Sequence, residues 1–157
     1  MTLPVQRFQT TLIAGATGHV FLPAPFDPAA VWGPRGAYHL AGTIDGMGCR
    51  GVLEQHDGTW VLRLGAAWRR DCGLAAGDVV DVVLTPEGPQ REGLAPDIAA
   101  ALEAEPAAGA FFDEIAQFYR KAYLAWIEAT KRSPAKRAER IAAVVELLKD
   151  RQKERPK

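Results

Sequence analysis

The pattern of apolar residues changes near residue 90, and this change constrains the fold more than any other feature of the sequence. Before it, short runs rich in β-branched and aromatic residues are separated by glycine and proline, which is typical of short strands joined by turns. Frequent short strands favour a small closed barrel, because closure removes exposed sheet edges. We expect six strands, at about residues 8–12, 19–22, 38–44, 52–54, 60–64 and 79–84, with one helical turn at 27–32.

Two turn signals join the expected strands. Asp57-Gly58 predicts a tight hairpin, because both central positions of such a turn can require positive φ. Residues 46–51 spell GxGxxG, a dinucleotide-binding pattern that needs a strand before it and a helix after it. Here strand-like residues follow, so the segment predicts a hairpin between two barrel strands.

The second half of the chain predicts helices. Pro96 opens a short helix that ends at Pro106, a longer helix covers about 111–130, and Ser133-Pro134 starts a last helix. The tail at 151–157 is expected to be frayed and solvated. The buried face of the long helix is expected to contain Phe111, Phe112, Ile115, Tyr119, Ala122 and Trp126, which leaves Leu124 alone in a polar stripe.

These patterns predict an α+β chain with two domains. A small β-barrel domain spans 1–90, and a helical domain of about three helices spans 91–157. With 157 residues, 48% of them hydrophobic, the chain is long enough to bury a core without metal or disulfide staples.

The composition argues against several kinds of chemistry. The chain has no Asn and one Ser, so it lacks most of the parts of a hydrolase triad. Its two cysteines, Cys49 and Cys72, form no CxxC motif, and its three histidines lack zinc-ligand spacing. We therefore expect no catalytic residues, no metal site, no cofactor and no enzymatic activity, with both thiols reduced.

The N-terminal residues lack the charged start and apolar run of a signal peptide, and no apolar run is long enough to span a membrane. We expect a cytoplasmic protein without membrane contact, either a monomer or a homodimer.

Positive charge gathers near the C-terminus, although the chain has no net charge. Residues 117–157 carry 12 basic and five acidic side chains. We single out Arg120, Lys131, Arg137 and Arg140 as candidates for binding an anion or an acidic partner; a solvated basic surface is the simpler interpretation. Arg137 falls on the apolar side of the last helix, so it requires either an internal acid such as Glu128 or an external anion. The wider basic cluster also contains Lys121, Arg132 and Lys136.

Two further interpretations remain open. Aromatic residues lie among these basic ones, as in proteins that bind nucleic acid, although Tyr119 and Trp126 are expected in the core. In the barrel, Asp45, Arg50 and Asp78 lie near strand ends and form a candidate ligand site at the barrel mouth. The simpler interpretation there is turn capping and surface ion pairs.

The chain also resembles a bacterial family. The segments 42–46, 73–74 and 77–80 resemble a small β-barrel domain of unknown function that often precedes a helical YdeI/OmpD-associated, or bacteriocin-protection, domain. The helical half resembles the latter through Pro96-Asp97-Ile98, Ala101-Leu102, Arg120, Trp126-Ile127, Lys131, Arg137 and Arg140-Ile141.

The resemblance implies a double-split barrel of the AbrB-like class followed by helices, and no secure enzymatic activity. The family names imply a link to envelope stress or antimicrobial-peptide tolerance. We therefore expect an uncharacterised binding or adaptor protein for an unidentified protein or small anion. The alternatives are a nucleic-acid-binding protein that uses the barrel and basic helices, and a small-ligand protein or enzyme that uses the barrel mouth.

Overall fold

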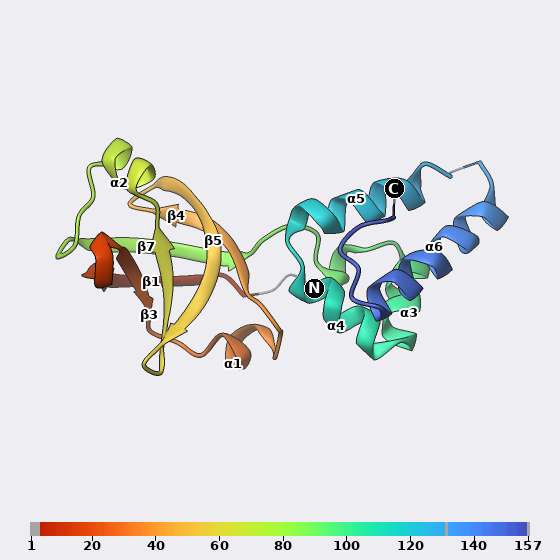
Figure 1. Ribbon diagram of the computed structural model, residues 1–157, viewed down its shortest axis with the longest axis horizontal. Coiled ribbons are helices and arrows are strands. Elements are labelled where there is room, and N and C mark those ends of the chain that lie inside the picture. Colours follow the sequence, from red (N-terminus) through yellow and green to blue (C-terminus); the bar gives the residue numbers. More distant parts are fainter. Residues whose placement is uncertain (1–3, 131, 157) are drawn as a thin grey trace. The chain divides into compact units, whose positions relative to one another are not determined.

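The computed structural model describes residues 4–130 and 132–156, which form two compact units. The barrel unit contains residues 4–34 and 38–86, and the helical unit contains residues 35–37 and 87–156. Each unit is described by itself below, and Figure 1 shows the elements of both.

The barrel unit contains one antiparallel sheet that curls into a nearly closed barrel (Figure 1). Its seven strands follow the order β1-β7-β4-β5-β6-β3-β2. The core lies inside the curl, where Leu22, Leu40, Ile44 and Leu84 are completely buried. The predicted α+β class and barrel are therefore confirmed. The strands are β1 (Gln6–Thr11), β2 (Ile13–Ala14), β3 (Val20–Ala24), β4 (His39–Ile44), β5 (Met47–His56), β6 (Thr59–Leu64) and β7 (Val79–Pro86).

Two short helices accompany the strands. The expected helical turn is α1 (Pro28–Trp32), whose N-cap Asp27 accepts a hydrogen bond from the Ala29 N–H. The second, α2 (Ala66–Cys72), was not predicted, and neither was β2. Because α2 buries none of its residues, its sequence lacks the apolar stripe that signals a helix.

Both turn predictions are confirmed. Asp45-Gly46 joins β4 to β5 with φ values of 49° and 81°, and Asp57-Gly58 joins β5 to β6 with 51° and 82°. Positive φ at both central positions is the signature of the tight hairpin turn. The GxGxxG segment thus lies in a β-hairpin, where no helix N-terminus follows it to hold a phosphate.

The helical unit contains one more helix than expected. Its helices are α3 (Pro96–Ala104), α4 (Pro106–Glu114), α5 (Gln117–Glu128) and α6 (Pro134–Lys149). The prediction of a single helix over 111–130 is wrong, because the backbone is extended at Ile115. At this break Arg120 donates hydrogen bonds to the carbonyl oxygens of Asp113 and Ile115. These bonds satisfy carbonyl groups that the end of a helix leaves without partners.

The break also changes which face of α5 is buried. Arg120, Tyr123 and Ile127 are the buried residues of α5, whereas Tyr119 and Trp126 are partly exposed. The prediction is wrong for Ala122, which is exposed, because it continued the phase of α4 across the break; Tyr119 and Trp126 pack against the core while staying partly exposed. Leu124, predicted to lie alone in a polar stripe, packs against the core.

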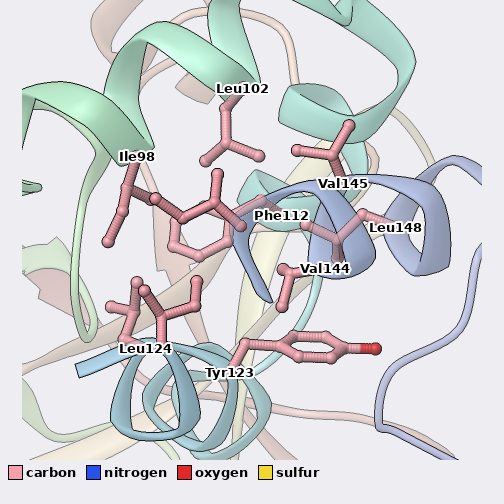
Figure 2. Close-up of a pocket in the computed structure, with 10 residues that line it drawn as sticks. Ile98, Leu102, Phe112, Tyr123, Leu124, Val144, Val145 and Leu148 are labelled. Carbon is pink, nitrogen blue, oxygen red and sulfur yellow. The ribbon is translucent and has the colours of Figure 1, made fainter. Parts of the chain in front are cut away.

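Figure 2 shows this core, in which apolar side chains of α3, α4, α5 and α6 point toward one another. The cavity between them measures about 10 Å³ and has an apolar lining. Such a space is at the lower limit for a single water molecule, so the centre of the helical unit is a packed core and not a ligand site.

The C-terminal tail, defined here as residues 151–156, is exposed but not frayed. After α6 the chain turns back, and the last residues approach α5 (Figure 1). The hydroxyl of Tyr123 donates a 2.6 Å hydrogen bond to the carbonyl oxygen of Gln152. The prediction of a frayed tail is therefore wrong, because the tail is bound to α5. Local composition does not reveal such a contact.

Candidate functional site

Arg120, the first of the predicted anion-binding residues, is 1% exposed. Its guanidinium donates to the carbonyl oxygens of Asp113 at 2.7 Å, Ile115 at 2.9 Å, Pro89 at 2.9 Å and Glu87 at 3.4 Å. Burial lowers the pKa of Arg120 to about 10, so the side chain remains cationic at neutral pH. Its hydrogen bonds all go to backbone carbonyl oxygens, so Arg120 stabilises the fold of the helical unit.

Arg137 faces two acids within the chain. Its Nε and Nη2 donate to the carboxylate of Asp97 at 2.6 and 3.0 Å, and its Nη1 donates to Glu128 at 3.0 Å. These hydrogen bonds raise the pKa of Arg137 and lower that of Asp97. The predicted partner Glu128 is confirmed. Asp97 was missed, because 40 residues separate it from Arg137 and only the packing of α3 beside α6 brings the two together.

Arg140 packs on the helix before its own. Its Nη1 donates a 2.7 Å hydrogen bond to the carbonyl oxygen of Trp126, and its guanidinium carbon lies 4.8 Å from the centroid of the Trp126 ring. Lys131, the remaining member of the predicted set, lies outside the described residues. Of the three described members of the set, Arg120 and Arg137 thus have partners within the chain and Arg140 packs on Trp126, so an anion- or partner-binding role for the set stays a prediction.

Arg140, together with Arg132 and Lys136, lines an open groove where the turn after α5 leads into α6. This depression, called here the basic groove, measures about 580 Å³. Arg132 and Lys136 are exposed, and within residues 4–130 and 132–156 neither side chain makes a hydrogen bond or an ion pair. The groove is lined by Glu128, Ala129, Thr130, Arg132, Ser133, Lys136 and Arg140.

The acid in the groove does not balance its cations. Glu128 is bound to Arg137, whereas Arg132, Lys136 and Arg140 have no acidic partner among the described residues. The sequence placed Arg132 and Lys136 in the basic cluster without singling them out. The sequence did offer a signal for them, because Arg132 directly precedes the N-cap Ser133 and Lys136 lies in the first turn of α6.

In the barrel unit, the predicted barrel-mouth residues lie on separate segments. Asp45 sits in the β4–β5 turn, where its Oδ1 accepts a 2.8 Å hydrogen bond from the Asp81 N–H. Asp78 precedes β7, and its Oδ2 accepts a 2.8 Å hydrogen bond from the Ala75 N–H. Arg50 lies within β5. Each aspartate thus stabilises local backbone structure, and a ligand role for these three residues stays a prediction.

Sequence reasoning missed a second depression, of about 490 Å³, in the barrel unit. On its lining, the rings of His19 and His56 lie 6.2 and 5.1 Å from the ring of Phe21. His56 also lies 2.9 Å from Glu54, which is itself paired with Arg63. Within the described parts of the chain, no three His, Cys, Asp or Glu side chains gather as metal ligands would.

The two cysteines are free thiols. Burial, with a smaller effect from the nearby Cys72, raises the pKa of Cys49 to about 11. The reactive form of cysteine is the thiolate. A thiol with such a pKa is almost entirely protonated at neutral pH, so Cys49 is a poor nucleophile.

The fold and the groove together define a two-part protein, a small barrel followed by a helical unit with an open basic surface. Comparison with protein families follows the same division. Residues 8–84 match a domain of unknown function (DUF1905), and residues 94–151 match the family described as bacteriocin-protection, YdeI or OmpD-associated. Residues 94–151 thus carry a domain of the YdeI/OmpD-associated family, and the domain of unknown function precedes it, as the resemblance predicted.

Comparison with curated proteins found no match. None of the helices in the described parts of the chain combines the length and apolar character needed to cross a bilayer.

Proposed function

We propose that this chain is a non-enzymatic binding or adaptor protein and that the basic groove is its contact surface for an acidic segment of a partner protein. The observation that carries the proposal is the state of Arg132 and Lys136. Both are exposed and lack a partner among the described residues, and the nearest groove acid, Glu128, is bound to Arg137.

The surroundings of these cations suit recognition of carboxylates. Arg140 adds a third positive charge, and Ser133 adds a polar side chain to the groove lining. One exposed ion pair contributes little affinity, but several like charges around one concavity attract an oppositely charged partner and orient it. An acidic segment that spans the groove would satisfy all three cations at once.

The family description supports a biological setting for this binding. It names bacteriocin protection, which fits the predicted link to envelope stress or antimicrobial-peptide tolerance. In this proposal the chain acts by holding a partner. Its cytoplasmic location and its lack of catalytic activity stay predictions.

Fluorescence anisotropy of a labelled poly-glutamate peptide tests the proposal. The groove variant Arg132→Gln/Lys136→Gln is expected to bind the peptide at least about tenfold more weakly than the unsubstituted protein. The matched control Arg7→Gln/Arg70→Gln removes the same charge from exposed positions of the barrel unit and is expected to leave binding unchanged.

Two results would contradict the proposal. Equal losses in the groove variant and in the charge-matched control would show that net charge, and not the groove, governs binding. Tighter binding of a single-stranded DNA or RNA oligonucleotide, with the steep salt dependence of phosphate contacts, would favour the nucleic-acid alternative.

A further inference from the structure

The C-terminal tail begins with an unusual turn. Arg151 has a φ of 57°, in the left-handed region that usually requires glycine. The Gln152 N–H donates to the carbonyl oxygen of Leu147 at 2.9 Å, and the Arg151 N–H donates to that of Leu148 at 3.0 Å. This pair of bonds is the Schellman motif, which ends α6 and reverses the chain direction.

Beyond the turn, alternate cationic side chains of the tail lie over aromatic rings of α4 and α5. Arg151 lies 4.7 Å from the centroid of Phe111, and Lys153 lies 5.3 Å from that of Tyr119. Arg155 lies 4.5 Å from the centroid of Trp126. Between these contacts, Tyr123 donates its hydroxyl hydrogen to the backbone of Gln152.

The spacing of these contacts shows what the surface recognises. The tail is not a strand, because the chain turns at Arg151 and bends at Lys153 and Glu154, and this path brings every second side chain onto a ring. Cations are attracted to the faces of aromatic rings at distances within about 6 Å. The surface formed by Phe111, Tyr119, Tyr123 and Trp126, called here the aromatic face, therefore fits a peptide that follows the same bent path and carries Lys or Arg at every second position.

The aromatic face continues beyond the tail. Phe118 is 68% exposed, and its ring packs edge-to-face on Tyr119 at a centroid distance of 5.2 Å. A large exposed ring beside an occupied binding surface adds contact area that the tail leaves unused. A peptide that also covers Phe118 would thus bury more aromatic surface than the tail does.

The tail and the aromatic face also differ in their relation to the family. The match to the YdeI/OmpD-associated family ends at residue 151, so it includes the aromatic face but not Lys153 or Arg155. Besides the ring contacts, the tail is held by the Tyr123 hydrogen bond and by an ion pair in which Arg151 donates to Glu114 at 2.9 Å. Lys153 and Arg155 are held by cation–π contacts, which are weak at exposed positions, so this part of the tail can be displaced.

We propose that the aromatic face binds a segment of another protein that carries Lys or Arg at alternate positions, and that the tail is its intramolecular competitor. This surface meets the basic groove at Arg140, which lies over the Trp126 ring, but it takes a partner of opposite charge. The tail acts at a high effective concentration, so it suppresses weak ligands and yields to longer ones.

The test uses the full chain with Lys153→Gln/Arg155→Gln, which removes two cations from the tail and keeps the turn at Arg151. The probe is a labelled peptide that repeats the alternation of Arg151, Lys153 and Arg155 and continues it by two further lysines. Anisotropy is expected to show at least about tenfold tighter binding to this variant than to the unsubstituted protein.

Three controls separate the proposal from general electrostatics. The variant Arg7→Gln/Arg70→Gln loses the same charge and is expected to show no gain. Tyr119→Leu or Phe118→Ala, added to the tail variant, is expected to abolish the gain while the far-UV circular dichroism spectrum stays unchanged. A probe of equal composition with adjacent cations is expected to bind more weakly.

A gain shared by the charge-matched variant, or one that survives Tyr119→Leu, would overturn the proposal. A concentration-dependent dimer of the unsubstituted protein that Lys153→Gln/Arg155→Gln abolishes would assign the aromatic face to the tail of a second copy and would also overturn it. Poly-glutamate binding is tested with Arg132→Gln/Lys136→Gln, and neither of these side chains contacts the aromatic face, so the two proposals fail on different variants and different peptides.

Discussion

The guanidinium group of Arg120 reaches back to the helix before its own, where its Nη2 donates a 2.7 Å hydrogen bond to the carbonyl oxygen of Asp113 near the end of α4. A cation at the C-terminal end of a helix is stabilised by the helix dipole. Here it also replaces the backbone donors that the break at Ile115 removes. One buried side chain thus fixes the corner between α4 and α5.

Replacing Arg120 with Met is therefore expected to destabilise the helical unit by about 3 kcal/mol or more, because several buried carbonyl groups lose their donor. Urea unfolding followed by circular dichroism measures this loss. Lys121→Met, at the exposed neighbouring position, is the matched control and is expected to have little effect. Similar stabilities for the two variants would contradict the structural position of Arg120.

The pair between Asp97 and Arg137 predicts a pH dependence. The hydrogen bonds from Arg137 hold the pKa of Asp97 below its usual value of 3.8. A carboxyl whose pKa is lower in the folded state stabilises the fold above its unfolded-state pKa, and this stabilisation is lost as the pH falls through the folded-state value. The unsubstituted protein should therefore be more stable than Asp97→Asn at neutral pH.

That difference is expected to shrink at pH values below about 4, where Asp97 becomes protonated. Thermal unfolding midpoints between about pH 2 and 7 measure it. Glu139→Gln, at an exposed position of α6, serves as the control for loss of one acid. Parallel pH profiles for Asp97→Asn and Glu139→Gln would contradict this role of the pair.

Gly42 of β4 predicts a strong steric effect. A Cβ atom at this position would overlap the backbone carbonyl of Val83 in the paired strand β7. Gly42→Ala is expected to destabilise the barrel unit by about 2–3 kcal/mol, because a backbone neighbour cannot move aside as a side chain can. Gly48→Ala is the matched control, since a Cβ there meets no atom within 4 Å. Equal stabilities by urea unfolding would show that the β4–β7 contact is looser than described.

Asp45 distinguishes turn stabilisation from ligand binding. Asp45→Asn keeps both the left-handed backbone and an oxygen acceptor for the Asp81 N–H, so its stability is expected to lie within about 0.5 kcal/mol of the original. Asp45→Ala loses the acceptor and strains the turn, at a cost of about 1–2 kcal/mol. Chemical unfolding of both variants gives the comparison. A tolerated alanine would mean that this carboxylate is not needed by the turn.

Local sequence signals were enough to predict the barrel and the starts of α3 and α6. Asp57-Gly58 determined a hairpin through backbone geometry, and Ser133-Pro134 determined the start of α6, where the Ser133 side chain accepts a hydrogen bond from the Lys136 N–H. Such signals depend on neighbouring residues alone. They can therefore be recognised in the sequence without knowledge of the tertiary structure.

The features that were missed depend on contacts distant in sequence. The break before α5 needs Arg120 to satisfy carbonyl groups of an earlier segment, and a periodicity argument places an arginine on the solvent face. Because that break shifted the helix phase, Ala122 was expected in the core although it is exposed, and the contact between Trp126 and Arg155 was missed. The acid opposite Arg137 was missed for the same reason, since Asp97 belongs to another helix.

The most direct test of the proposed function is an NMR titration of the isotope-labelled full chain with the poly-glutamate peptide. We expect the largest backbone amide shifts on residues 128–140 around the basic groove, with the strongest at Arg132, Ser133 and Lys136. Largest shifts in the barrel unit, or small shifts spread evenly over both units, would contradict it.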